Sequence, residues 1–239
     1  MNRRKFLTHS ITLGGAAALL PMTRAHAADE SVKGLVVEKS RLAPPANGSI
    51  PVAILISAGL NVIDFSGPWG VFESVQIPDA NEPPFRLFTV AETAEVVTSG
   101  SGLKLMPHYT FANAPEVKVV VIPAQRGSDA MREWLRKIAR TADVTMSVCT
   151  GAFQLAKAGL LSGKPATTHH EFLDKLEREF PDIHVKRGVR FVESEKISTA
   201  GGLTSGTDLA LRVVERYFGR GIAQATTTYM EYDGKGWIV

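Results

Sequence analysis

The fold of this chain is decided by one stretch of sequence, Thr145-Met146-Ser147-Val148-Cys149-Thr150-Gly151-Ala152-Phe153. The short apolar run Val144 to Val148 predicts a buried strand, and Thr150 to Ala158 is expected to form a helix. A cysteine at such a junction, with a glycine two positions later, is typical of a nucleophile elbow, a sharp turn that pushes a reactive side chain out of the sheet. We therefore predict that Cys149 is a nucleophile.

The position of Cys149 also predicts a thiol with a lowered pKa. Free N–H groups and the positive end of the helix dipole favour thiolate over thiol at the start of a helix. The alternative is that Cys149 is a small buried hydrophobic residue, as cysteine often is. It is the single cysteine of the chain, so it has no intramolecular disulfide partner.

Apolar runs alternate with helical patterns along the rest of the chain. Further strands are expected at Val52 to Ile56, Phe85 to Val90, Val117 to Ile122, Val189 to Val192 and Lys196 to Thr199, with a small hairpin around Gly100-Ser101-Gly102. Further helices are expected at Ser66 to Ser74, Ser128 to Arg140, Glu171 to Phe180 and Thr204 to Phe218. This alternation predicts an α/β fold with a mainly parallel central sheet covered on both sides. Ligands of such sheets gather at the carboxyl ends of the strands.

Asp64 is the expected proton partner of Cys149. It lies in the loop Gly59 to Phe65, after the first predicted strand, and strand-end loops of a parallel sheet converge. Its apolar neighbours predict a partly desolvated carboxyl group with a raised pKa, suited to proton transfer. The alternative is that Asp64 only caps the helix that contains Pro68, for which Ser66 is another candidate cap.

Two other segments contain residues that could take part in chemistry. His169 and His170 stand where a helix is expected to begin, and histidine is a common proton shuttle, although adjacent histidines are also ordinary at a surface. The histidines and acids show no metal-ligand spacing, so no metal site is predicted. The glycine-rich segment Gly201 to Gly206 precedes a helix but lacks phosphate-loop and dinucleotide spacing, so a tight turn is the favoured interpretation.

The first residues predict an export signal. Arg3-Arg4-Lys5-Phe6-Leu7, the short apolar run Ile11 to Leu20 and the site Ala25-His26-Ala27 are typical of a twin-arginine signal peptide at 1–27, which implies a periplasmic or secreted protein. The apolar run is too short to span a membrane, so no membrane association is expected after signal removal. Residues 28–49 are interpreted as a linker or extended arm, and residues 50–239 as the folded domain.

Loss of residues 1–27 would remove four of the 27 basic residues and none of the 24 acidic ones, leaving a charge of about −1. Because no basic patch is clustered in the remainder, the sequence does not support a nucleic-acid partner. A small-molecule substrate is expected instead.

Four motifs together resemble the ThiJ/PfpI superfamily, in order, over about Ile50 to Tyr232. They are Ile63-Asp64-Phe65-Ser66-Gly67-Pro68, Ser147-Val148-Cys149-Thr150-Gly151, Gly159-Leu160-Leu161-Ser162-Gly163-Lys164-Pro165-Ala166-Thr167-Thr168-His169 and Thr199-Ala200-Gly201-Gly202-Leu203-Thr204-Ser205-Gly206-Thr207-Asp208. The similarity is greatest to the branch that holds the isonitrile hydratases and the amidase-like halves of AraC-type regulators.

The resemblance implies a flavodoxin-like three-layer sandwich, usually a homodimer, that needs no cofactor. It implies that Cys149 attacks an isonitrile carbon, that Asp64 transfers protons, and that Thr150 is the residue that distinguishes hydratases. The product would be an N-substituted formamide. Many relatives have paired glycines where this chain has Ala124-Gln125, at a position whose backbone N–H can serve an oxyanion. His169 matches a histidine that some relatives use in their active sites. The possible accessory residues are therefore His169, Gly151, Ala124 and Gln125.

Two kinds of alternative remain open. Glyoxalases and deglycases of the same superfamily use a cysteine, an acid and a histidine at the position of His169, typically with glutamate where Asp64 stands. A non-catalytic redox or ligand sensor is the second alternative, since an accessible low-pKa cysteine oxidises readily. A PfpI-type peptidase is disfavoured because Thr150 stands where those enzymes have histidine.

Overall fold

The computed structural model describes residues 33–36, 41–46 and 48–239. The expected signal peptide, residues 1–27, lies outside the described residues, and the segment 28–49 is described only in part.

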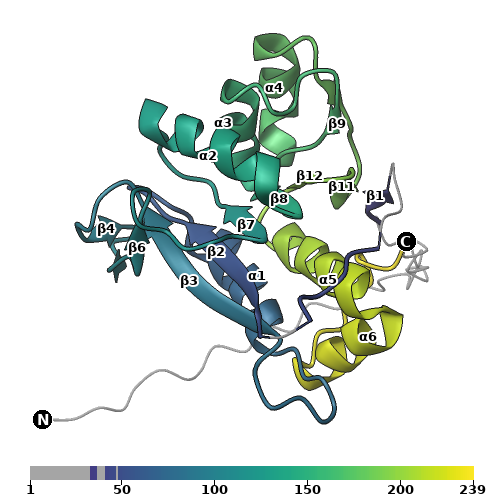
Figure 1. Cartoon of the computed structure of the whole chain (residues 1–239). Helices are drawn as coiled ribbons and strands as arrows, with labels where there is room; N and C mark the ends of the chain where they lie inside the picture. The colour runs from purple at the N-terminus through teal and green to yellow at the C-terminus, as the bar shows by residue number, and fades with distance from the viewer. Residues whose placement is uncertain (1–32, 37–40, 47) are drawn as a thin grey trace, which may run out of the picture. The chain divides into compact units, whose positions relative to one another are not determined.

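An eight-stranded sheet forms the centre of the described chain (Figure 1). In sheet order its strands are β1 (Leu35–Val36), β11 (Phe191–Glu193), β12 (Ile197–Ala200), β8 (Val144–Val148), β7 (Val119–Ile122), β2 (Ile50–Leu55), β3 (Phe85–Ala91) and β6 (Tyr109–Thr110). Every neighbouring pair is parallel except β11 and β12. Taken in chain order, the five central strands lie in the doubly wound order 2-1-3-4-5 of flavodoxin-like folds. The predicted fold class is confirmed.

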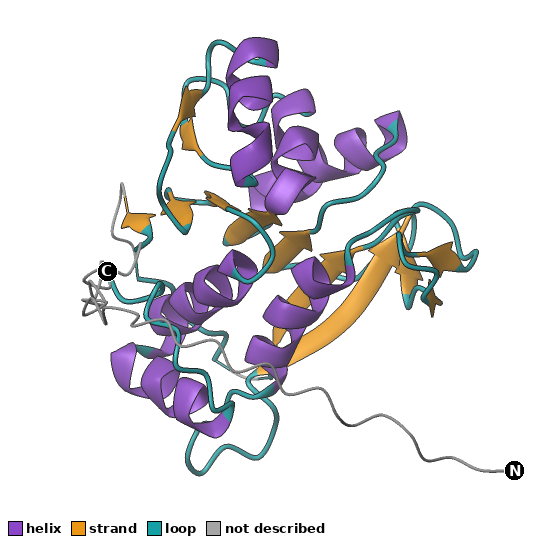
Figure 2. Ribbon diagram, turned by 180° about the vertical axis from the view of Figure 1, so that it is seen from behind, coloured by secondary structure: helices purple, strands orange, loops and turns teal. Residues whose placement is uncertain are grey.

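Helices cover both faces of this sheet, which makes three layers (Figures 1 and 2). One face carries α1 (Val62–Glu73), α5 (Ser205–Phe218) and α6 (Arg220–Tyr229), and the other carries α2 (Asp129–Thr141), α3 (Ala152–Lys157) and α4 (Leu173–Glu179). Short 3₁₀ turns, η1 (Cys149–Gly151) and η2 (His170–Phe172), precede α3 and α4. None of the helices within the described residues is long and apolar enough to cross a membrane.

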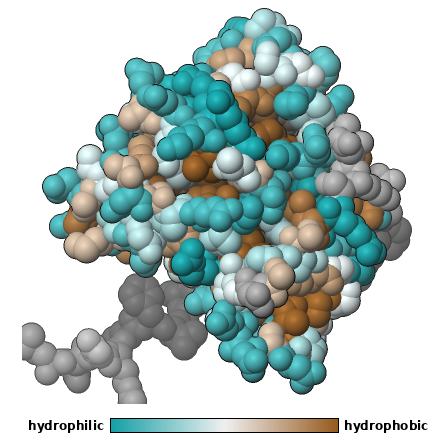
Figure 3. Space-filling view, in the orientation of Figure 1, coloured by the Kyte–Doolittle hydropathy of each residue, from teal (hydrophilic) through white to brown (hydrophobic). Residues whose placement is uncertain are grey.

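Strand residues alternate between two hydrophobic cores. Val52 and Ile54 of β2 pack into the core beneath α1 and α5, whereas Ala53 and Leu55 pack into the core beneath α2 and α3. This two-sided burial explains why the strands are continuous apolar runs rather than alternating patterns. The outer face shown in Figure 3 is mostly hydrophilic, with hydrophobic residues visible in separate small areas.

The largest difference from the sequence-based expectation is where α1 begins. The helix starts at Val62 and is capped by Asn61, whose side chain accepts a hydrogen bond from the Ile63 N–H at 3.2 Å. Ser66 is therefore not the cap, and Asp64 lies in the first helical turn rather than in a loop. The helix continues through Pro68, although a proline inside a helix removes one N–H donor and crowds the carbonyl four residues earlier.

The structure adds elements that the sequence patterns did not predict. Strand β1 lies within the expected linker or arm, α6 follows α5 directly, and β6 extends one edge of the sheet. The parallel pair β9 (Pro165–Ala166) and β10 (His184–Val185) is also new. The predicted hairpin is present as β4 (Val97–Thr98) and β5 (Lys104–Leu105).

Candidate active site

Cys149 occupies a strained turn at the end of β8. Its φ of 56° lies in the left-handed region, which costs a residue other than glycine roughly 1–3 kcal/mol. Two hydrogen bonds hold this conformation. The Cys149 N–H donates to the Gly201 carbonyl at 2.8 Å, and its carbonyl accepts from the Thr168 hydroxyl at 2.9 Å. The predicted nucleophile elbow is thus built by β8 and supported by two segments distant in sequence.

Gly151 allows the elbow to lie close to β7. A Cβ atom at this position would come within 2.1 Å of the Ile122 carbonyl oxygen and 2.9 Å of the Pro123 carbonyl oxygen, both of them backbone atoms. Any side chain would therefore push the turn away from the sheet. The structure thus gives Gly151 a steric role in the turn, and its expected part as an accessory residue of the site stays a prediction.

The carboxyl group of Asp64 is fully buried beside this turn. Its Oδ2 accepts a hydrogen bond from the Ala124 N–H at 3.0 Å, and the thiol of Cys149 interacts with the same carboxyl group. Oδ1 is buried without a partner of normal hydrogen-bond geometry among the described residues. Burial raises the pKa of Asp64 to about 6, against the smaller opposing effects of the Ala124 and Cys149 hydrogen bonds. The expected contact and the expected raised pKa are both present.

The protonation of Cys149 differs from the sequence-based expectation. Burial, followed by the negative charge of Asp64, raises the pKa of the thiol to about 11, although backbone and side-chain hydrogen bonds oppose the shift. The prediction of a low-pKa thiolate is wrong, because only 7% of the residue is exposed and the Asp64 carboxylate adjoins it. The resting pair is a neutral thiol beside a carboxylate.

Two backbone amides and one hydroxyl face the sulfur of Cys149. The N–H groups of Thr150 and Leu203 and the side chain of Thr150 hydrogen-bond to the sulfur, and each lowers its pKa. Leu203 was not predicted as a site residue. It has a φ of 50°, and its side chain is 39% exposed. The signal available in the sequence was the glycine pair before it, which was interpreted as a tight turn only.

Ala124 and Gln125 lie beside the site, and the backbone N–H of Ala124 is already engaged. The Ala124 N–H is occupied by Asp64, and the Gln125 side chain donates to the Leu55 carbonyl at 3.0 Å. Gln125 also lines a pocket of about 230 Å³ with Thr150, Phe153 and Phe172. Ala124 therefore orients the carboxylate, and Gln125 lies at a cavity beside the elbow.

His169 contacts the loop that carries Leu203 and not the thiol. Its Nδ1 accepts from the Glu171 N–H at 3.4 Å, its ring packs on His170, and a Cβ on Gly202 would lie 2.5 Å from its Cδ2. This places His169 behind the site as a support for the loop. No group of three or more histidine, cysteine or acidic residues that could hold a metal ion occurs within the part of the chain that the structure describes.

The comparisons with known proteins agree with this architecture. Residues 51–216 match the model of the DJ-1/PfpI family. The chain is 32% identical to an isonitrile hydratase from Pseudomonas putida over 190 residues, which cover 77% of this chain and 79% of that protein. It is 28% identical over 154 residues to the HTH-type transcriptional regulator GbdR from Pseudomonas aeruginosa, a match that spans 62% of this chain and only 42% of the regulator.

Solved structures show the same fold. A THiJ/PfpI family protein from Pseudomonas syringae superposes with a TM-score of 0.69 at 28% identity, over 78% of this chain and 76% of that one. Drosophila melanogaster DJ-1beta superposes with a TM-score of 0.66 at 17% identity, over 77% of this chain and 98% of that one. The matched family model covers both Asp64 and Cys149. This chain therefore belongs to the DJ-1/PfpI family.

Proposed function

We propose that this protein is a cysteine-dependent enzyme that adds water to an isonitrile and releases an N-substituted formamide. The observation that carries the proposal is the contact between the Cys149 thiol and the buried Asp64 carboxylate inside a strained elbow. Similarity to the Pseudomonas putida isonitrile hydratase supports this substrate class. The reaction requires one nucleophile and one group that can move protons, and the proposal assigns these roles to Cys149 and Asp64.

In the first step the sulfur of Cys149 bonds to the terminal carbon of the isonitrile. Asp64 accepts the thiol proton as the bond forms, because the carboxylate is the base in contact with this thiol. The same proton then passes from Asp64 to the former isonitrile carbon. The product of this step is a thioimidate, Cys149–S–CH=N–R, and Asp64 is again a carboxylate.

In the second step water adds to the thioimidate carbon. Asp64 takes one proton from the water and delivers it to the nitrogen, which leaves a tetrahedral carbon bearing OH, NHR and the sulfur of Cys149. The C–S bond then breaks, the hydroxyl proton returns to the sulfur through Asp64, and the formamide R–NH–CHO departs. The N–H groups of Thr150 and Leu203 stabilise the departing thiolate, since they contact the sulfur.

The proposal is tested by incubating the wild type and Cys149→Ser with a panel of isocyanides and, separately, with a panel of dicarbonyls. We expect the wild type to release formamides and Cys149→Ser to lose at least about three orders of magnitude in rate. Intact-protein mass spectrometry should detect the thioimidate on the wild type alone. Consumption of dicarbonyls without formamide production would instead identify a glyoxalase or deglycase.

A ligand sensor is the second candidate function, and the match to transcriptional regulators favours it. Saturable binding of an isocyanide to both the wild type and Cys149→Ser, with no formamide released by either, would support the sensor. A redox sensor is less well supported, because burial and the Asp64 charge raise the pKa of the thiol.

The proposal includes export by the twin-arginine route, based on Arg3-Arg4-Lys5-Phe6-Leu7, and assembly as a homodimer, based on family resemblance. Replacement of both arginines by lysine should keep the protein out of the periplasmic fraction. Light scattering of the purified protein should give a mass of two chains. If the double-lysine variant still reaches the periplasm, the export proposal is contradicted. If the purified protein is a monomer, the dimer proposal is contradicted.

A further inference from the structure

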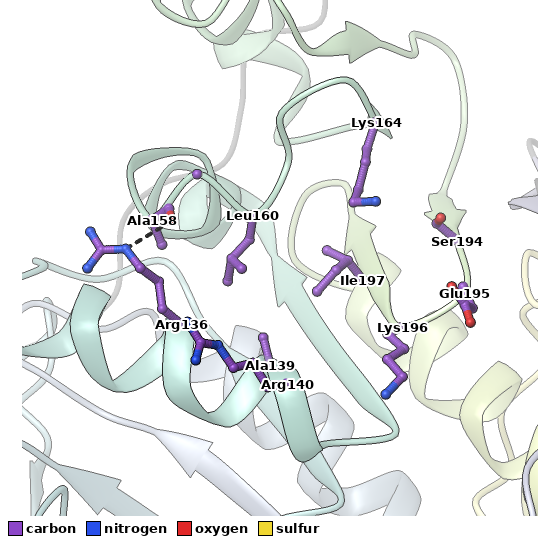
Figure 4. Close-up of a pocket in the computed structure, with 11 residues that line it drawn as sticks. Arg136, Ala139, Arg140, Ala158, Leu160, Lys164, Ser194, Glu195, Lys196 and Ile197 are labelled. Atoms are coloured by element: carbon purple, nitrogen blue, oxygen red, sulfur yellow. Dashed lines mark hydrogen bonds between the residues drawn. The ribbon is translucent and has the colours of Figure 1, made fainter.

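A pocket of about 540 Å³ lies at the end of the sheet opposite the elbow (Figure 4). It is bounded by the second half of α2, the end of α3 and the turn between β11 and β12. Strand β12 runs parallel to β8, and its first residue, Ile197, pairs with Thr145. Thr145 precedes Cys149 by four residues, or roughly 13 Å of strand at about 3.3 Å per residue. The pocket is therefore separate from the candidate active site.

Four cationic side chains from three segments line this pocket. They are Arg136 and Arg140 of α2, Lys164 before β9, and Lys196 at the start of β12. In Figure 4 the Lys164 side chain reaches toward Ile197 from above, and Lys196 lies on the lower side. Glu195 is the one acidic residue in the pocket lining.

None of these four cations has an ion pair within the described residues. Some other surface cations of the described chain do have counter-charges close by, as Arg187 does in Asp174 and Glu177 at 2.9 and 2.7 Å. Four cations against the single carboxylate of Glu195 leave the pocket lining with an excess of positive charge, in a protein whose formal net charge is +3 at pH 7. Several cations that line one pocket with a single acidic residue among them can attract and bind a multiply charged anion.

Part of the remaining pocket lining is apolar, and one of the four cations is held in place by a hydrogen bond. Leu160 and Ile197 supply aliphatic surface between the cations, and Arg136 is anchored by donating from Nε to the Ala158 carbonyl at 3.2 Å. A volume of several hundred Å³ with an apolar wall and a few polar groups is typical of sites for small organic molecules. An inorganic ion alone would leave most of this volume and the aliphatic surface unused.

We propose that this pocket binds a small organic phosphate ester. The phosphate group contacts Arg140, Lys164 and Lys196, and the organic part packs against Leu160 and Ile197. A phosphate dianion suits the site better than a single carboxylate, because it offers more acceptor oxygens and more charge to three cations from separate segments. The ligand would occupy this site independently of any molecule at Cys149.

Isothermal titration calorimetry on the full chain tests this proposal with adenosine 5′-monophosphate, inorganic phosphate and adenosine as probes. We expect the nucleotide to bind more tightly than inorganic phosphate, adenosine not to bind measurably, and the affinity to fall with added salt. The double variant Lys164→Gln/Lys196→Gln should weaken nucleotide binding by about tenfold or more. Both lysines are exposed, so the variant is expected to fold.

Two controls keep the outcomes distinct. Lys137→Gln removes an exposed lysine of α2 that does not line the pocket, and it should bind the nucleotide like the wild type. Cys149→Ser should also bind it unchanged, which separates this site from the proposed hydratase activity. The proposal is overturned if neither phosphate probe binds, or if Lys137→Gln weakens binding as much as the double variant does.

Discussion

The first turns of α1 and α5 each carry a buried aspartate, and the two differ in how their oxygens are partnered. Asp64 and Asp208 both have no exposed surface, and burial raises the pKa of both carboxyl groups. Their helices pack against each other closely, since a Cβ atom on Gly67 of α1 would lie 2.8 Å from the Thr207 Oγ1 of α5. The two carboxylates therefore differ in local partners rather than in depth of burial.

Asp208 is surrounded by donors. Arg190 approaches its Oδ2 with Nε at 2.6 Å and Nη2 at 2.5 Å, the Tyr232 hydroxyl donates to Oδ1 at 3.0 Å, and a backbone hydrogen bond comes from Trp237. Asp64 has the single amide of Ala124 and the weakly donating thiol of its neighbour. A buried carboxylate with all its partners holds structure together, whereas one left partly unsatisfied is available for proton transfer.

The largest expected effect tests Asp64 as the proton-transfer group. Asp64→Asn should lower kcat/KM for formamide production by about 10²- to 10⁴-fold, because the amide cannot accept the thiol proton. The amide oxygen can still accept the Ala124 N–H, so the variant should fold. Steady-state kinetics and the unfolding midpoint in urea measure the two properties. Normal activity in this variant would remove Asp64 from the mechanism.

The pH dependence of stability gives the next effect. The pKa of Asp64 rises from 3.8 to about 6 on folding, so between these values the folded state holds a proton that the unfolded state has lost. The free energy of unfolding of the wild type, relative to Asp64→Asn, should therefore fall as the pH rises from about 4 to 6. The total change is about 3 kcal/mol, for a pKa rise of about two units. Urea unfolding of both proteins at a series of pH values measures it, and parallel curves would contradict the raised pKa.

Asp208→Asn should lower stability and keep activity, whereas Asp64→Asn should lower activity and keep the fold. An asparagine has only one acceptor oxygen, and its NH₂ group is a donor. Either Arg190 or the Tyr232 hydroxyl, which both donate to Asp208, would then face this NH₂ group. We expect a loss of roughly 2 kcal/mol in the free energy of unfolding. Chemical denaturation measures this loss, and the folded variant should remain an active enzyme. Loss of formamide production without loss of stability would break the contrast between the two aspartates.

Tyr232→Phe should give the smallest effect. The change removes one donor to Asp208 and leaves both Arg190 contacts, so the carboxylate stays partnered. The expected cost is about 1 kcal/mol of unfolding free energy with unchanged kcat/KM. Thermal and urea unfolding at neutral pH measure it. A cost as large as that of Asp208→Asn would mean that the hydroxyl, rather than Arg190, is the main partner.

Much of the active site follows from local patterns in the sequence. The apolar run ending at Val148 predicts β8 to the residue, and the cysteine and glycine after it predict the elbow. Asp64 could be named because loops at the carboxyl ends of parallel strands meet. The position of Asp64 inside α1 could not be predicted. The helix is capped by Asn61 and contains Pro68, so it begins closer to the N-terminus than the sequence pattern indicated.

What the sequence by itself determined was the fold class, the sharp turn at Cys149 and the choice of Cys149 and Asp64 as candidate site residues, since these depend on periodicity and on residue type at strand ends. Only the tertiary structure decided the protonation of Cys149, because desolvation and the Asp64 charge depend on segments brought together by folding. It also decided which amides face the sulfur and which are already occupied. Leu203 and Ala124 have no reactive side chains, and the direction of a backbone N–H is set by φ, ψ and packing rather than by residue identity.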